Sequence, residues 1–185
     1  GRYEVSLTVD GRTYKQPLTL VNDPRVDVPQ SGLAAQLKNE QRMTAGMNAS
    51  YLAFFQIDSM RTVIADNATR IANGSTKTGL PESLHALDKQ LATLADSSFG
   101  IANRDLTRQL EDADFGDLAP TANNLTTTEL SCRDLGTAFS EFNRLLAGPI
   151  PALNATLRAA GLKPLPLPQS PQDSHCGGTG ATAYR

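Results

Sequence analysis

The feature that most constrains this chain is a single helical pattern from about Gln30 to Asn73. Its apolar residues recur at spacings of three and four, which places them along one side of a helix: Leu33, Leu37, Met47, Tyr51, Phe54, Ile64, Ala68 and Ile71. At 1.5 Å per residue, a helix of roughly 40 residues is about 60 Å long. A rod of this length needs packing partners along its whole side, so we expect the rest of the chain to supply them.

The chain after this rod predicts a return leg of two short helices. Leucines at helical spacing predict the first, from about Glu82 to Asp96: Leu84, Leu87, Leu91 and Leu94. We expect a break at residues 97–100, which read Ser-Ser-Phe-Gly, and then a short helix that carries Leu106 and Leu110 and ends near Asp114. The return leg is therefore expected to be broken in its middle.

A third leg is predicted after the turn at Pro120-Thr121. A helix is expected from about Thr126 to Ala147, and its inner face carries Leu130, Ala138, Phe142 and Leu145. A last short helix follows Gly148-Pro149 and stops at Gly161, and it is lined by Ile150, Leu153 and Leu157. Short connections between helices imply antiparallel neighbours. The fold class we expect is therefore mainly α, with an up-down helical bundle over residues 27–162.

Residues 1–26 have the pattern of a β-hairpin. Side chains of the first strand alternate between two faces, and the apolar face carries Tyr3, Val5, Leu7 and Val9. Asp10-Gly11 supplies the positive φ angles of a two-residue turn, and Pro24 ends the second strand. An isolated two-stranded hairpin is marginal in water. We therefore expect these strands to be the last two of a truncated β-sandwich, and the chain to begin inside a larger protein.

Residues 163–185 form a tail that is rich in Pro and Gly. Alternating Pro favours an extended polyproline conformation, and the remainder has little to bury. We expect the tail to lie along the bundle at first and then to fray. It carries Cys176, whereas Cys132 lies in a helical segment. The sequence leaves open whether these two cysteines pair, so their number does not indicate a compartment.

Composition and charge exclude some classes of function. The formal net charge is −2 and the basic residues are scattered, which is unlike the basic footprint of a nucleic-acid binder. No apolar run approaches 18 residues, so we expect no membrane span. No charged-then-apolar leader follows Gly1. Any targeting signal is therefore expected to lie upstream or to have been removed.

Candidates for catalytic or metal chemistry are few. His85 lies on the leucine-rich helix and is interpreted as a solvated residue, and His175 lies in a tail without the rigid support that a site needs. The acidic run at residues 111–117 lacks the bidentate Glu of a calcium loop. We interpret it as a turn in which Asp114 or Asp117 caps backbone N–H groups. No catalytic, cofactor-binding or metal-binding residue is proposed, and no cofactor is expected.

Two further features concern surfaces. A cluster in the long helix is interpreted as core: Met47, Tyr51, Phe54, Phe55 and Met60. Phe55 is the exception, because it points about 100° away from Phe54 and must leave the apolar seam. Five Asn-x-Ser/Thr sequons begin at Asn48, Asn67, Asn73, Asn124 and Asn154. Their glycosylation requires a source that secretes through a eukaryotic pathway.

Three segments together resemble a known architecture. They read GRYEVSLTVDGRTYKQPLTLVNDPRV at residues 1–26, DFGDLAPT at residues 114–121 and IPALNATLRAAGLKPL at residues 150–165. In this order, with a long helix after the first, they resemble the C-terminal region of large bacterial proteins with sialidase-type (BNR or Asp-box) β-propeller repeats. Such proteins are often labelled glycosyl hydrolases or sortilin-like Vps10 proteins. The resemblance spans nearly all 185 residues, and the Pro- and Gly-rich tail with Cys176 departs from it.

This resemblance implies a non-catalytic structural or interaction module in an exported protein, extracellular or periplasmic. Any glycoside hydrolase activity would belong to an absent upstream propeller, so no catalytic residue carries over to this chain. The expected partners are the upstream β-sandwich and propeller, which would cover Tyr3, Val5, Leu7 and Val9. Apart from the resemblance, Phe55 is a candidate contact to the hairpin domain or to a protein partner. Two alternatives remain: an accessory part of a glycan-acting hydrolase, and a helical partner-binding module.

Overall fold

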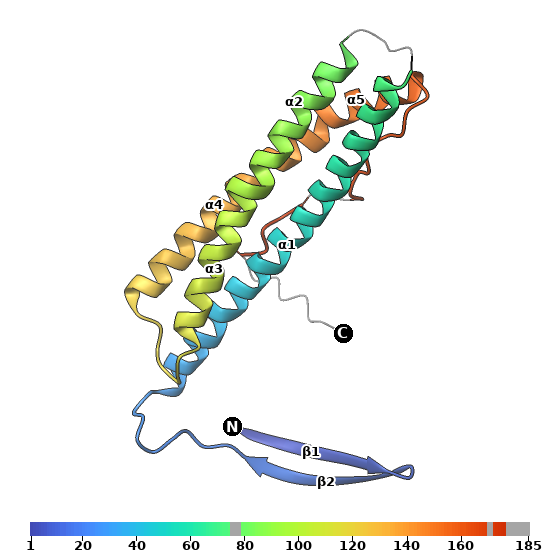
Figure 1. Ribbon diagram of the computed structural model, residues 1–185. Helices are drawn as coiled ribbons and strands as arrows, with labels where there is room; N and C mark the ends of the chain where they lie inside the picture. Colours follow the sequence, from blue (N-terminus) through green and yellow to red (C-terminus); the bar gives the residue numbers. More distant parts are fainter. Residues whose placement is uncertain (75–78, 170–171, 177–185) are drawn as a thin grey trace.

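Three helical legs form the body of the molecule in the computed structural model, which describes residues 1–74, 79–169 and 172–176 (Figure 1). The first leg is α1 (Gln30–Ala72). The second consists of α2 (Leu80–Thr93), the π-helical turn η1 (Leu94–Phe99) and α3 (Gly100–Ala113), and the third of α4 (Ala122–Ala147) and α5 (Pro149–Ala159). Strands β1 (Arg2–Val9) and β2 (Arg12–Thr19) precede them. The mainly α fold with an N-terminal hairpin is confirmed.

Helix α1 has the predicted length, but its buried side differs from the predicted seam. Leu37, Tyr51 and Phe54 are exposed, so their assignment to the core was wrong. The side that packs inward combines small, polar and apolar residues: Asn39, Met43, Gly46, Ala49, Ser50, Ala53, Ile57, Met60, Val63, Ile64 and Asn67. Apolar periodicity alone does not detect such a face, because several of its positions are not apolar.

Hydrogen bonds between the legs explain why α1 can bury polar residues. The Asn103 amide of α3 donates to the Ser50 hydroxyl at 2.7 Å and to the Met47 carbonyl at 3.0 Å. Nearer the start of α1, the Asn39 amide donates to the Thr128 hydroxyl of α4 at 3.2 Å. Burial of a polar group costs free energy unless the group is hydrogen-bonded. These pairs therefore fix how the three legs align along their length.

The second leg is continuous, and the break predicted at residues 97–100 was wrong. The chain widens into a π turn, in which the Gly100 N–H donates to the Ala95 carbonyl five residues before it. A Cβ added at Gly100 would lie only 3.0 Å from that oxygen, so the glycine fits the wide turn. The turn lets Phe99 point into the core, where its ring packs against Phe139 and Phe142 of α4 at centroid distances of 4.9 and 6.0 Å. A π turn in a helix adds one residue without ending it.

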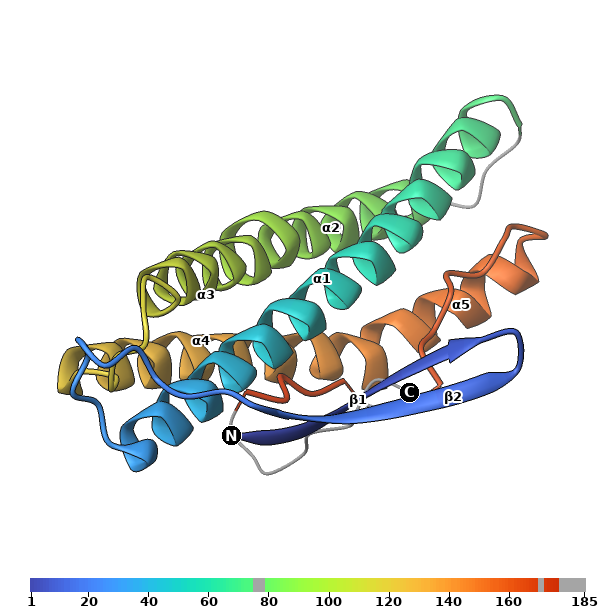
Figure 2. The same cartoon turned by 90° about the horizontal axis from the view of Figure 1, so that it is seen from below.

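The third leg begins at a well-formed cap. The Thr121 hydroxyl accepts from the Asn124 N–H at 3.1 Å, and the Asn124 side chain accepts in return from the Thr121 N–H. This reciprocal cap starts the helix four residues earlier than the predicted Thr126. Helix α5 continues along the direction of α4 (Figures 1 and 2), so the closing helix does not turn back as a short connection had implied. Leu130, expected inside, is exposed.

The hairpin forms with the predicted turn. Asp10 and Gly11 have φ angles of 49° and 75°, and β1 and β2 pair antiparallel from Arg2 opposite Thr19 to Val9 opposite Arg12. Every residue of both strands is exposed, and they form a two-stranded sheet. Figure 1 shows the hairpin beyond the end of the bundle at which α1 begins. The described sheet therefore has no core of its own.

Candidate functional site

The hairpin has one face that is mostly apolar. Residues directly opposite each other in an antiparallel pair share a face, so Tyr14 and Leu18 of β2 join the predicted residues of β1. Each of these six side chains is between 43% and 60% exposed: Tyr3, Val5, Leu7, Val9, Tyr14 and Leu18. The opposite face is polar, with Lys15 bound to Glu4 at 2.8 Å and the Thr8 and Thr13 hydroxyls 3.0 Å apart. We call the apolar side the hairpin face.

The two edges of the hairpin differ in what they can pair with. The Gly1 and Leu20 backbones exchange both hydrogen bonds, which sets the alternation along the ladder. The N–H groups of Glu4, Ser6 and Thr8 therefore point away from β2, along a free edge that can accept another strand. The corresponding outward position in the middle of β2 is occupied by Pro17, which has no N–H.

The aromatic cluster on α1 lies at the surface. The Phe55 ring packs edge to face against Tyr51 at a centroid distance of 4.5 Å and against Phe54 at 6.2 Å. All three rings are at least 40% exposed, as is the neighbouring Leu52. Met60 is buried as predicted, but the aromatic part of the cluster is not core. Phe55 is thus placed where a partner can reach it, and its role in an interaction stays a prediction.

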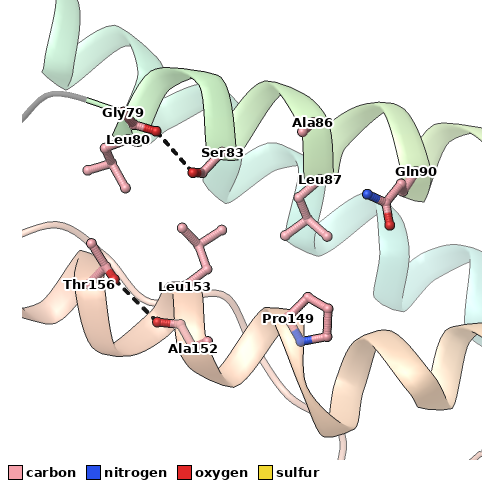
Figure 3. A pocket seen from close by; sticks show the side chains of 10 residues that line it. All are labelled: Gly79, Leu80, Ser83, Ala86, Leu87, Gln90, Pro149, Ala152, Leu153 and Thr156. Carbon is pink, nitrogen blue, oxygen red and sulfur yellow. Dashed lines mark hydrogen bonds between the residues drawn. The ribbon is translucent and has the colours of Figure 1, made fainter.

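A groove of about 580 Å³ lies between α2 and α5 (Figure 3). Its walls are mainly apolar, with Leu80 and Leu87 on one side and Leu153 on the other. The hydroxyls at its rim bond within their own helices, Ser83 to the Gly79 carbonyl at 2.9 Å and Thr156 to the Ala152 carbonyl at 3.3 Å. Among the residues that the structure describes, no Asp, Glu, His, Lys, Arg or Cys lines this groove, and its hydroxyl groups are those of Ser83 and Thr156.

The tail crosses the bundle as an extended strap, which we define as residues 163–169 and 172–176 (Figure 2). Asn67 of α1 donates to the Lys163 carbonyl at 2.8 Å and accepts the Lys163 N–H at 3.2 Å. Asn154 of α5 forms the same two bonds with Leu165, at 2.9 and 2.6 Å. The expectation that the tail lies along the bundle is confirmed for these residues, and its end lies outside the described residues.

Three further contacts hold the far end of the strap. The Asn143 side chain of α4 pairs with both backbone groups of Gln172, at 2.7 and 2.9 Å. Arg42 of α1 donates to the Cys176 carbonyl at 2.9 Å. Cys176 forms a disulfide with Cys132 of α4, which resolves the question that the sequence left open. The strap therefore binds all three of the helices that border it.

The disulfide also removes one candidate for chemistry. Cys176 is fully buried and bonded, so its sulfur is not a free nucleophile beside His175. The His175 imidazole is exposed and lies 4.0 Å from the Asp173 carboxylate. His85 is exposed, as expected. Among the described residues, no three His, Cys, Asp or Glu side chains gather in an arrangement that could hold a metal ion.

The acidic run at the end of α3 is held by a residue that the sequence did not single out. Gln36 of α1 donates to the carbonyls of Ala113 and Gly116 at 2.8 and 2.9 Å and accepts the Leu118 N–H at 3.2 Å. The predicted turn is present, and the side chain that bonds to its backbone is Gln36 and not Asp114 or Asp117. An amide side chain caps this turn because it can donate and accept at once.

Charged side chains pair at the surface and not inside a groove. The Arg25 guanidinium binds the Asp23 carboxylate at 2.6 Å and holds the pKa of that carboxyl below its ordinary value. On the bundle, Asp88 of α2 binds Arg61 of α1 at 2.8 Å and raises the pKa of Arg61. Exposed pairs of this kind add little to stability, because water and salt screen them. They orient a turn and a helix pair.

Two of the asparagines that begin a sequon hold the strap in place. Asn67 and Asn154 are buried with both amide atoms bonded to the strap, so a glycan on either is incompatible with this fold. Their spacing gave no sign of this role, because the two lie far apart in sequence and meet only where the strap passes them. The alternating prolines of the tail were the available signal that an extended segment needs side-chain partners.

Comparison with known proteins assigns this chain to no family and no fold. No family model, no curated protein and no solved structure matches this chain. Within the described residues, no helix is both long and apolar enough to cross a membrane.

Proposed function

We propose that this chain is a non-catalytic structural and interaction module whose hairpin supplies the last two strands of a β-sandwich in a larger, exported propeller protein. The hairpin face carries the proposal, because six exposed apolar side chains on one side of a two-stranded sheet need a second layer to bury them. The described lining of the α2–α5 groove contains no titratable side chain, which is compatible with a module without catalytic chemistry of its own.

The two edges of the hairpin indicate which of its strands would pair with the missing sheet. Pro17 on the outward side of β2 suits an edge strand that ends a sheet, whereas the outward N–H groups of β1 suit a strand inside one. The missing strand would thus pair with β1, and the missing sheet would cover the hairpin face. Any glycoside hydrolase activity would reside in the propeller.

A matched pair of proline substitutions tests this arrangement. Ser6 and Lys15 lie directly opposite each other, and both N–H groups point outward. In the longer polypeptide, Ser6→Pro should prevent the pairing of β1 with its neighbour and make the hairpin sensitive to protease. Lys15→Pro should leave it resistant, because the β2 edge is free. Equal sensitivity of the two variants would contradict the proposed sheet order.

Two simpler observations bear on the family resemblance. Ser-x-Asp-x-Gly-x-x-Trp repeats encoded upstream of Gly1 would support it, and their absence would remove it. Hydrogen exchange on the isolated 185 residues should show weak protection throughout β1 and β2. Strong protection in the monomer, or glycan hydrolysis by these residues alone, would overturn the proposal.

The exposed aromatic cluster favours a second candidate, a helical partner-binding module. Phe55, Tyr51 and Phe54 present a continuous aromatic surface on the outer side of α1. Aromatic side chains are enriched where one protein anchors to another. The test is a Phe55→Ser variant that keeps its helical content. If this variant no longer binds a partner protein that the wild-type chain binds, the result supports this candidate over one in which only the hairpin makes contacts.

A further inference from the structure

Two asparagines of the bundle hold the strap through its backbone atoms and not through its side chains. At Lys163 and Leu165 a helix asparagine donates to the backbone carbonyl and accepts the backbone N–H of the same residue. This pair of bonds imitates what an adjacent β-strand provides, and it reads the backbone alone. With the strap in place, Asn67 and Asn154 are themselves almost completely buried, so both amides are enclosed between the helices and the strap backbone.

The prolines of the strap fall where this recognition needs no donor. Lys163 and Leu165 each give an N–H to an asparagine, and they alternate with Pro164 and Pro166, which have none. In an extended segment, successive N–H groups point to different sides. Proline at the alternate positions therefore loses no bond to the helices, and it restricts the free segment to extended conformations, which lowers the entropy cost of binding.

One side chain of the strap provides an apolar anchor. Leu165 is only 2% exposed and belongs to the main core, whereas Lys163, Pro166 and Leu167 stay exposed. Beside the anchor, Pro164 and Pro166 border an open recess of about 360 Å³ against α1, so these positions are not tightly enclosed. The site that holds residues 163–166 between α1 and α5 thus selects an extended backbone with a leucine at one position, and it accommodates proline on either side of that leucine.

We propose that the groove between α1 and α5 is a peptide-binding site for extended x-Pro-Leu-Pro segments, occupied in cis by residues 163–166. The Cys132–Cys176 disulfide closes it to other peptides, because a tethered segment competes at a high effective concentration. A dithiol would release the strap by reducing this disulfide. The dithiol gives two electrons and two protons to the disulfide, which becomes two thiols, and the dithiol is itself oxidised to a disulfide.

Peptide binding to a full-length variant with a weakened strap tests the proposal. The open-strap variant combines Leu165→Asp, which opposes burial of the anchor, with Cys132→Ala and Cys176→Ala. The probe is a fluorescent peptide with the wild-type sequence of residues 162–169, LKPLPLPQ. Fluorescence anisotropy should show saturable binding to the open-strap variant that is at least about tenfold tighter than to the oxidised wild-type chain, because the cis segment no longer fills the groove.

Control variants assign the binding to the asparagines and the leucine. Adding Asn154→Leu to the open-strap variant should weaken binding of the probe at least about tenfold, because leucine has the same branched shape but cannot pair with the backbone. Adding Asn123→Leu, at an exposed position of α4, should change nothing. A probe that carries the Leu165→Asp change should bind at least about tenfold more weakly.

Each remaining outcome contradicts the proposal. Helical circular dichroism must show that the open-strap variant is folded, and loss of its helices would mean that the strap is an integral part of the core and not an exchangeable ligand. A folded variant without saturable binding would exclude the site. Equal binding to the oxidised wild-type chain would place the peptide elsewhere.

Discussion

The hairpin and the strap are both extended segments beside the same helical bundle, and they are attached to it in opposite ways. The hairpin pairs sixteen residues of its own backbone with one another but has no buried residue. The strap has no regular secondary structure, yet Leu165 and Cys176 are completely or almost completely buried. Regular hydrogen bonding therefore does not tell whether a segment belongs to a core.

The two segments differ in which part of the molecule supplies the hydrogen-bond partners of their backbone. Hairpin strands bond to each other, so the bundle makes no use of them, whereas the strap takes its bonds from asparagines on three helices. A buried backbone group without a partner costs about 1–3 kcal/mol. Removal of those asparagines should therefore destabilise the bundle, and changes in the hairpin should not.

The largest effect is expected from loss of the disulfide. Cys132 and Cys176 are 44 residues apart in sequence, and the closure entropy of such a loop corresponds to about 4 kcal/mol. The Cys132→Ala, Cys176→Ala double variant should lose about this amount of unfolding free energy in urea titrations. Wild-type protein reduced with a dithiol is the control and should behave alike. A loss below about 1 kcal/mol would show that the strap holds without its covalent bond.

The next effect concerns a single asparagine of the strap site. Asn154→Leu leaves the N–H and carbonyl of Leu165 without partners in a buried place, which should cost about 2–4 kcal/mol. The exposed Asn123→Leu is the matched control and should stay within about 0.5 kcal/mol of wild type. Urea unfolding followed by helical circular dichroism measures both. Equal stability of the two variants would remove the distinction between strap and hairpin.

A smaller effect tests how closely the disulfide packs on α1. Replacement of two glycines by alanine should change the unfolding free energy in opposite directions. A Cβ at Gly46 would lie 2.9 Å from the Cys176 sulfur, whereas nothing lies within 4 Å of a Cβ at Gly136. Gly46→Ala should lower the unfolding free energy by about 1–2 kcal/mol, because the clash outweighs the better helix propensity of Ala. Gly136→Ala should raise it by up to about 1 kcal/mol. Thermal unfolding distinguishes the two signs.

The smallest effect belongs to the hairpin. Leu7 is 60% exposed, so Leu7→Ser should change the unfolding free energy of the bundle by less than about 0.5 kcal/mol. The same change should weaken any association that depends on the hairpin face. Destabilisation of the isolated chain by more than about 1 kcal/mol would mean that the hairpin packs on the bundle in solution.

The sequence predicted the elements better than their packing. Asp10-Gly11 determined the hairpin, and leucine spacing determined α2, because these signals are local. The inner side of α1 was predicted wrongly, since Asn39 and Ser50 are buried where Thr128 and Asn103 of other helices form hydrogen bonds with their side chains. No local pattern contains that information.

The candidate sites show the same limit. The apolar face of β1 followed from alternation alone, and the structure places those residues on one side of the sheet. The strap site could not be predicted, because it requires Asn67, Asn154 and Leu165 to meet in space from three separate parts of the chain. Likewise, Ser-Ser-Phe-Gly resembles a break, but the π turn accommodates it because Phe99 gains ring contacts in the core.

Burial of two sequon asparagines has a consequence for how this chain can be produced. Asn67 and Asn154 each begin an Asn-x-Thr sequence, and oligosaccharide transfer acts on such sequences while a chain is still unfolded. A glycan attached to Asn154 at that moment would keep Leu165 out of the core and hold Cys176 away from Cys132. The position of the strap thus makes the folding of this protein depend on a biosynthetic route that leaves these asparagines bare.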